Sequence, residues 1–197
     1  MIEANFRKIY QSVCVDPLLR FKIIYKLPPN LLTCLSTLFG LSVTPLLFFG
    51  LYIEAFIFMI FSGFLDTLDG SLARYLKISS SKGAVLDIVS DRLVEFAILL
   101  GLYSIDPHSR ALPTIVMLGS ILICVSSFLV VGIFTENKTQ KGFFYSPGLI
   151  ERAEAFIFFS IMILFPKSYL FLSYLFAFLV FVTAAIRIGQ FLKKEKI

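Results

Sequence analysis

The stretch DTLDGSLARYLKISSSKGAVLDIVSD, residues 66–91, places four aspartates inside a region that otherwise has the apolar composition of a membrane protein. These acids are Asp66, Asp69, Asp87 and Asp91. A carboxylate at membrane depth is energetically costly, so four of them in one hairpin need a shared counter-charge. Divalent metal ions supply that charge most simply.

The polar turn around residues 75–82 joins the apolar segments on either side of it into an antiparallel pair. Residues equidistant from the middle of the turn then lie at similar depth, so Asp66 is level with Asp91 and Asp69 with Asp87. Spacings of three and four residues also place each pair on one helical face. We therefore expect the four carboxylates to converge on one small volume, about 10 Å inside the helix ends.

Hard oxygen ligands in this number favour Mg²⁺, Mn²⁺ or Ca²⁺, and two ions balance four carboxylates better than one. Such a site commonly holds a diphosphate during phosphoryl transfer. Gly70, Ala73 and Gly83 reduce side-chain bulk near the acids, and Arg74 offers a fork of donors to phosphate oxygens. The competing interpretations are a packing network, in which the aspartates pair with Arg74 or Arg92, and a proton or ion pathway.

The whole chain has the composition of a polytopic membrane protein. Its 197 residues are 58% hydrophobic, with a mean hydropathy of +0.89 and no Trp, values that are unusual for a soluble domain. We therefore predict an all-α integral membrane fold, with a single domain over residues 1–197. Six transmembrane helices are expected near residues 30–49, 51–74, 83–104, 112–134, 150–166 and 168–191.

The segment before the first span mixes apolar and basic residues over residues 1–27. This mixture predicts an amphipathic helix that lies on the membrane surface. Pro29 and Asn30 separate it from the first span, and Asn30 is expected to be the N-cap of that span.

Basic residues predict the orientation of the chain. They concentrate in the N-terminal segment, the 75–82 turn, the segment with Lys138 and Lys141, and the C-terminal tail, whereas the opposite loops hold only Arg110 and Lys167. Lys and Arg accumulate on the cytoplasmic side of membrane proteins, so both termini are expected to be cytoplasmic. The aspartate site is then expected to open to the cytoplasm, in a protein of the cell (inner) membrane. The net charge of +5 is then a signal of topology, and we expect no nucleic-acid partner.

Residues 66–91 resemble the signature of the CDP-alcohol phosphatidyltransferase family. Every fixed position of Asp66-x-x-Asp69-Gly70-x-x-Ala73-Arg74, eight residues, and Gly83-x-x-x-Asp87-x-x-x-Asp91 is matched. The six expected spans and the PNLLT entry at residues 29–33 extend the resemblance over most of the chain. It implies transfer of a phosphatidyl group from CDP-diacylglycerol to the hydroxyl of a small alcohol in phospholipid biosynthesis, with release of CMP, by a homodimer.

The resemblance also implies roles for individual residues. Asp66, Asp69 and Asp87 would hold one of two divalent ions, Mg²⁺ or Mn²⁺. Asp66, Asp87 and Asp91 would hold the second ion, and Asp91 would accept the proton of the acceptor hydroxyl as general base. The CDP moiety of the donor would be bound by Asn30, Thr33, Gly70, Ala73, Arg74, Ser80 and Gly83.

A group of basic residues gives an indication of the acceptor. It comprises Lys138, Lys141 and Arg152. These residues suit a phosphate on the acceptor, although the lysines are also explained as ordinary positive-inside residues. The segment Gly148–Arg152 resembles the start of the fifth span in family members that use inositol phosphate. A phosphorylated polyol is therefore expected, inositol phosphate before glycerol 3-phosphate, rather than free serine.

Two other functions compete with the transferase. A membrane prenyltransferase also holds a diphosphate with aspartates and Mg²⁺, but we expect it to need two separate aspartate-rich motifs, whereas here all four acids lie in one hairpin. A divalent-cation transporter would bind its ion near the bilayer midplane between paired broken helices. The cytoplasmic offset of the aspartates argues against it.

Overall fold

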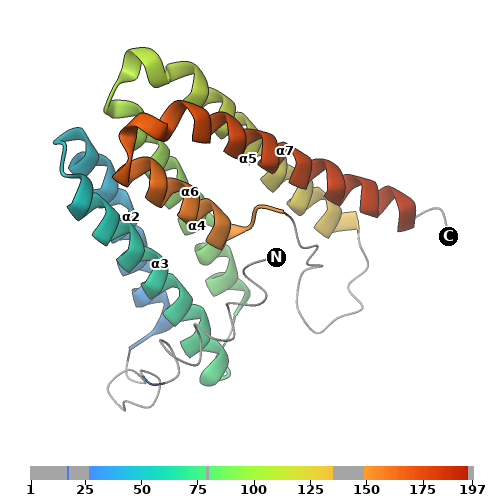
Figure 1. Cartoon of the computed structure of the whole chain (residues 1–197). Helices are drawn as coiled ribbons and strands as arrows, with labels where there is room; N and C mark the ends of the chain where they lie inside the picture. The colour runs from blue at the N-terminus through green and yellow to red at the C-terminus, as the bar shows by residue number, and fades with distance from the viewer. Residues whose placement is uncertain (1–16, 18–26, 79, 135–148, 195–197) are drawn as a thin grey trace. The chain divides into compact units, whose positions relative to one another are not determined.

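The computed structural model describes residues 17, 27–78, 80–134 and 149–194. All regular elements of these residues are helices, which confirms the predicted all-α class (Figure 1). The surface helix expected over residues 1–27 lies outside the described residues, apart from residues 17 and 27. Close packing divides the chain into two units, one within residues 4–108 and one within residues 109–197.

The helical boundaries agree with the predicted spans to within a few residues. The helices are α2 (Pro29–Phe48), α3 (Tyr52–Tyr75), α4 (Ser81–Ser104), α5 (Pro107–Phe134), α6 (Arg152–Leu164) and α7 (Tyr169–Lys194), with a 3₁₀ turn η4 (Pro166–Ser168) before α7.

Within the part of the chain that the structure describes, four helical segments are long and apolar enough to cross a membrane: Pro29–Phe48, Tyr52–Tyr75, Pro107–Phe134 and Pro166–Lys193. The predicted count of six is thus not confirmed by length and composition. Helix α4 has 24 residues but carries the acids of the site. Helix α6 has only 13 residues, which is short for a bilayer crossing.

The start of α2 differs from the prediction. Asn30 is not its N-cap, because the helix begins at Pro29 and Pro28 occupies the cap position without a side-chain hydrogen bond. Proline is well suited to the first helical position, since its φ is already helical and its missing N–H would have no partner there. Asn30 therefore lies in the first turn, with its side chain exposed.

The end of α3 is defined by a backbone motif next to the aspartates. Lys77 has a φ of 56°, the left-handed conformation that commonly terminates helices. The N–H of Ile78 donates to the carbonyl of Ala73 at 3.1 Å, and the N–H of Lys77 donates to that of Arg74 at 3.2 Å. These two bonds satisfy the last carbonyls of α3 and turn the chain toward α4.

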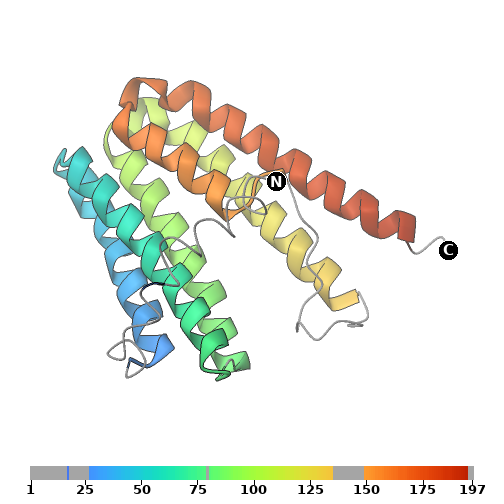
Figure 2. The same ribbon diagram turned by 60° about the horizontal axis from the view of Figure 1, so that its bottom comes forward.

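Helix α2 packs against both α3 and α4 in the first unit (Figures 1 and 2). Against α3, the hydroxyls of Ser36 and Ser62 each donate to the backbone carbonyl of the other residue at 2.8 Å. Against α4, a Cβ at Gly40 would lie 2.5 Å from a methyl of Val94, so only glycine permits this approach. Small residues and interhelical hydroxyl bonds are typical of packing between membrane helices.

In the second unit, side chains of α5 contact η4 and the start of α7. The buried guanidinium of Arg110 donates to the carbonyl of Pro166 at 2.9 Å and lies 4.3 Å from the centroid of the Tyr169 ring. The hydroxyls of Tyr169 and Thr114 are 2.7 Å apart. These contacts tie α5 to η4 and α7.

Candidate active site

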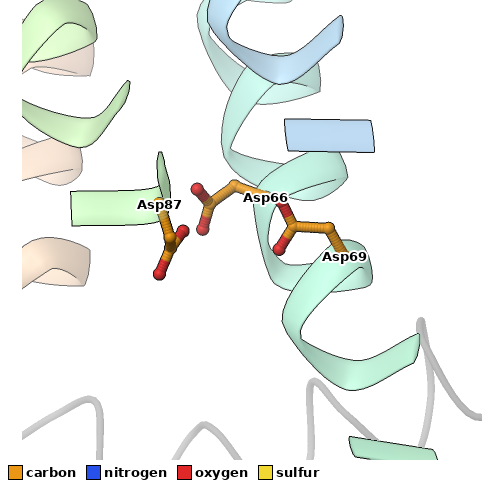
Figure 3. Close-up of side chains that lie close together, drawn as sticks. All are labelled: Asp66, Asp69 and Asp87. Carbon is orange, nitrogen blue, oxygen red and sulfur yellow. The ribbon is translucent and has the colours of Figure 1, made fainter. Parts of the chain in front are cut away.

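Three of the four predicted aspartates lie together. Asp66 and Asp69 on α3 and Asp87 on α4 each offer a carboxylate oxygen, and these oxygens all lie within 4.8 Å of one another (Figure 3). Two oxygen ligands on opposite sides of a bound ion are about 4.2 Å apart for Mg²⁺ and about 5 Å apart for Ca²⁺, which is twice the usual metal–oxygen distance. The donor set and its spacing therefore fit a divalent cation.

The depth of this three-carboxylate cluster follows from its position along the helices. Asp69 lies six residues before Tyr75, the last residue of α3, and Asp87 lies six residues after Ser81, the first residue of α4. Six residues correspond to about 9 Å along a helix axis. The cluster is therefore within reach of a head group that enters from the helix ends.

Asp69 is oriented by a residue of a third helix. It is only 4% exposed, and its Oδ2 accepts a hydrogen bond from the hydroxyl of Thr33 on α2. Thr33 is itself 5% exposed. A hydrogen bond of this kind fixes the direction of a metal-binding carboxylate. Thr33, which was predicted to border the donor pocket, thus contacts the cluster directly.

Asp91 is not among the three clustered acids. It lies one helical turn beyond Asp87, and its Oδ2 is 4.0 Å from Nη2 of Arg92. The other terminal nitrogen of Arg92, Nη1, lies 2.6 Å from Oε2 of Glu95. The alternative prediction, that the aspartates pair with Arg92, therefore holds at Asp91.

Several predicted donor residues lie near the turn that joins α3 to α4. Ser80 is the N-cap of α4, and its hydroxyl accepts a hydrogen bond from the N–H of Gly83 at 3.1 Å. Arg74 lies in the last turn of α3 and donates to the hydroxyl of Ser71 at 3.1 Å. Ala73, also predicted to contact CDP, is half-buried in the same turn.

Two glycines of the motif are not required by packing within the protein. A Cβ on Gly83 would lie 3.4 Å from the Ser80 hydroxyl and 3.6 Å from Oδ1 of Asn30, which are ordinary contacts. A Cβ on Gly70 would lie 3.3 Å from the flexible end of Arg74. Neither glycine has a positive φ. A ligand that approaches the backbone at these positions would explain why a side chain is absent.

The second unit contains a buried cation that the sequence reading missed. Arg187 on α7 is 9% exposed, and its Nη1 donates to the carbonyl of Cys124 at 3.0 Å and to the hydroxyl of Ser127 at 3.1 Å. Its guanidinium lies 5.4 Å from the ring centroid of Phe128. Among the described residues, no carboxylate forms a salt bridge with Arg187. An arginine inside an apolar span was the available signal, because such residues usually have a functional partner.

The start of α6 lies close to the same part of α7. The N–H groups of Leu149 and Ile150 donate to the hydroxyl of Thr183 at 3.2 and 3.1 Å, and Thr183 precedes Arg187 by one helical turn. Arg152, the first residue of α6, is half-buried, with its guanidinium 5.8 Å from the ring centroid of Phe156. Lys138 and Lys141, the other predicted acceptor residues, lie outside the described residues.

Comparison with known proteins gives the family. The family model for CDP-alcohol phosphatidyltransferases matches residues 26–188, and the chain belongs to this family. Similar proteins include the inner membrane protein YnjF of Escherichia coli, which is 29% identical over 81% of each chain. A phosphatidylinositol phosphate synthase of Corynebacterium glutamicum is 30% identical over 80% of this chain and 71% of its own.

A further relative is a bifunctional IPC transferase and DIPP synthase of Archaeoglobus fulgidus, 30% identical over 53% of this chain and 21% of its own length. Family membership makes the chain a transferase of phospholipid biosynthesis that uses a CDP-alcohol donor and an alcohol acceptor. The apolar helices make it a membrane protein. These findings favour the transferase over the prenyltransferase and transporter alternatives.

Proposed function

We propose that this protein transfers the phosphatidyl group of CDP-diacylglycerol to a hydroxyl of a phosphorylated polyol and releases CMP. Inositol phosphate is the first candidate acceptor, and glycerol 3-phosphate is the second. The observation that carries the proposal is the convergence of Asp66, Asp69 and Asp87 within 4.8 Å, next to glycines that packing does not require. The proposed site faces the cytoplasm, and the proposed assembly is a homodimer.

In this proposal, the aspartates hold two divalent ions, Mg²⁺ or Mn²⁺. Asp66, Asp69 and Asp87 bind one ion, while Asp66, Asp87 and Asp91 bind the other. When bound, the ions neutralise the diphosphate and stabilise the charge that develops on the CMP leaving group. Thr33 keeps the Asp69 carboxylate turned toward the cluster through its hydrogen bond.

Asp91 is the proposed general base. It takes the proton of the acceptor hydroxyl as the hydroxyl oxygen bonds to the phosphorus that carries the diacylglycerol. The bond from that phosphorus to the bridging diphosphate oxygen breaks, and the electron pair leaves with CMP. A carboxylate one helical turn beyond Asp87 can act on a hydroxyl held beside the cluster.

The donor subsite is assigned to the end of the hairpin where the turn joins α3 to α4. Gly70 and Gly83 let the diphosphate approach the backbone, and Arg74 and the Ser80 hydroxyl bind its oxygens. Asn30 faces Gly83 from α2, which supports a contact between its amide and the nucleotide. Ala73 contributes little bulk on the same side of α3.

The phosphate of the acceptor is assigned to a group of cations, of which Arg152 begins α6 and Arg187 lies on α7. Arg187 is a buried guanidinium without a described carboxylate partner, and an acceptor phosphate would offset its charge. Arg152 begins the helix whose preceding residues bond to Thr183, one turn from Arg187. Lys138 and Lys141 belong to the same proposed group. The name of the Corynebacterium relative, a phosphatidylinositol phosphate synthase, supports inositol phosphate as the first candidate.

The direct test is CMP release by the purified protein with CDP-diacylglycerol and Mg²⁺. Inositol phosphate, glycerol 3-phosphate, serine and inositol are supplied one at a time, and the lipid product is identified by mass spectrometry. We expect inositol phosphate to support the fastest release and EDTA to abolish it. Preference for free serine or free inositol would contradict the phosphorylated acceptor, and release without any alcohol would contradict the transfer.

Removal of an acceptor cation should mainly affect acceptor binding. Arg152→Ala and Arg187→Gln are each expected to lower kcat/KM for the phosphorylated acceptor by about 10- to 100-fold, since a hydrogen bond to a charged group contributes about 1.5–3 kcal/mol. Steady-state kinetics with varied acceptor and varied donor measure this effect. Lys167→Gln, at an exposed position before α7, is the matched control. An equal loss for donor and acceptor would argue against an acceptor subsite.

A further inference from the structure

Helix α4 carries a further acid, Glu95, one helical turn beyond the last aspartate of the motif. Asp87, Asp91 and Glu95 follow one another at four-residue intervals, so they lie along one face of the helix. Glu95 is 9% exposed, although the family signature in residues 66–91 does not include it. Neighbouring acids at this spacing repel each other when no cation lies between them.

Arg92 supplies that cation. Its Nη1 is 2.6 Å from Oε2 of Glu95, and its Nη2 is 4.0 Å from Oδ2 of Asp91. The side chain of Arg92 is 38% exposed, compared with 11% for Glu95 and 15% for Asp91. The more deeply buried Glu95 therefore anchors one end of the guanidinium, and the other end is presented to Asp91.

The planar guanidinium links the two contacts. Its two terminal nitrogens are held in a fixed fork, so the ion pair of Nη1 with Glu95 limits the positions that Nη2 can take beside Asp91. A lysine at position 92 would bring a single ammonium, which cannot reproduce both ends of the fork. The charge next to Asp91 is thus fixed by a residue one turn away that does not belong to the three-carboxylate cluster.

We propose that Glu95 is a positioning residue. It acts through Arg92 to hold the carboxylate of Asp91 in the orientation in which that carboxylate accepts the proton of the acceptor hydroxyl. This inference rests on the proposed function of Asp91. Without Glu95, the long Arg92 side chain is free to leave its position, because more than a third of it is exposed. Asp91 then samples orientations in which neither oxygen faces the acceptor hydroxyl, and misplacement of a catalytic group by about 1 Å can cost about 100-fold in rate.

The test is a double-mutant cycle of Arg92→Ala and Glu95→Gln. Each single variant is expected to lower kcat by about tenfold or more, with less than a threefold change in KM for either substrate. Because Glu95 acts through Arg92, the double variant should be no slower than Arg92→Ala alone. Arg92→Lys should be intermediate between Arg92→Ala and the wild type, since it restores the charge but not the fork.

Three further measurements distinguish positioning from simple loss of structure. The thermal midpoint of Arg92→Ala, whose side chain is partly exposed, should match the wild type. Most of its increase on addition of Mn²⁺ should be retained, because Asp66, Asp69 and Asp87 still lie together. Glu54→Gln, an exposed acid on α3, is the control and should leave kcat unchanged. Wild-type kcat in Glu95→Gln, or fully additive losses in the double variant, would overturn the proposal. An inactive wild-type protein would instead contradict the proposed function itself.

Discussion

Asp66→Asn is expected to lower the rate of CMP release by about a thousandfold or more. The amide keeps the size of the side chain but removes one of the three clustered carboxylates, and in the proposed site Asp66 is a ligand of both ions. Metal ions supply several kcal/mol of transition-state stabilisation in such reactions, and each 1.36 kcal/mol corresponds to about a tenfold change in rate. Loss of this shared ligand should therefore weaken both the binding of the donor diphosphate and the stabilisation of the CMP leaving group.

The same variant should respond differently to metal in the absence of substrates. Mn²⁺ binds the folded protein and is expected to raise the thermal midpoint of the wild type, whereas Asp66→Asn should show little increase. Glu54→Gln is a suitable control, because Glu54 is an exposed acid of the same helix, twelve residues earlier. A variant that retains activity within tenfold of the wild type and keeps its response to Mn²⁺ would contradict the metal site.

Much of the hairpin was predictable from residues 66–91, because its spacing constrains both helices. A polar turn between two apolar segments predicts an antiparallel pair, and the observed helices begin and end within two residues of the expected spans, at Tyr52–Tyr75 and Ser81–Ser104. Short intervals between acids on a helix also predict a common face. The convergence of Asp66, Asp69 and Asp87 follows from these two facts.

The exact position of the Asp91 side chain could not be predicted from the spacing. Equal distance from the turn gives depth, but four residues along a helix also move a side chain by about 6 Å along the axis and about 40° around it. Asp91 is displaced in this way from the cluster that contains Asp87. The neighbouring contact with Arg92 depends on side-chain conformation, which spacing alone does not determine.

Other features depended on packing between distant segments. The hydrogen bond from Thr33 to Asp69 joins residues 36 positions apart, and nothing in either local sequence specifies it. Asn30 was expected to cap α2, but with proline at the first helical position the cap is Pro28, two residues earlier. Arg187 could not be assigned from the positive-inside rule, because that rule concerns charges in loops and this arginine lies within a span.

Asp91→Asn tests the chemical step separately from the metal site. We expect turnover to fall by about 100- to 10,000-fold, the range that general base catalysis commonly contributes. Donor binding should be partly retained, because Asp66, Asp69 and Asp87 remain together without Asp91. The measurement pairs kcat for CMP release with the increase in thermal midpoint that CDP-diacylglycerol and Mn²⁺ produce in the absence of acceptor.

The two aspartate variants are informative as a pair, since the proposal predicts opposite patterns for binding. Asp66→Asn should lose both turnover and stabilisation by metal and donor, whereas Asp91→Asn should lose turnover and keep a substantial part of the stabilisation. If Asp91→Asn remains fully active, Asp91 is not the base. If it instead loses stabilisation as completely as Asp66→Asn, Asp91 acts mainly as a metal ligand, and the acceptor proton must leave by another route.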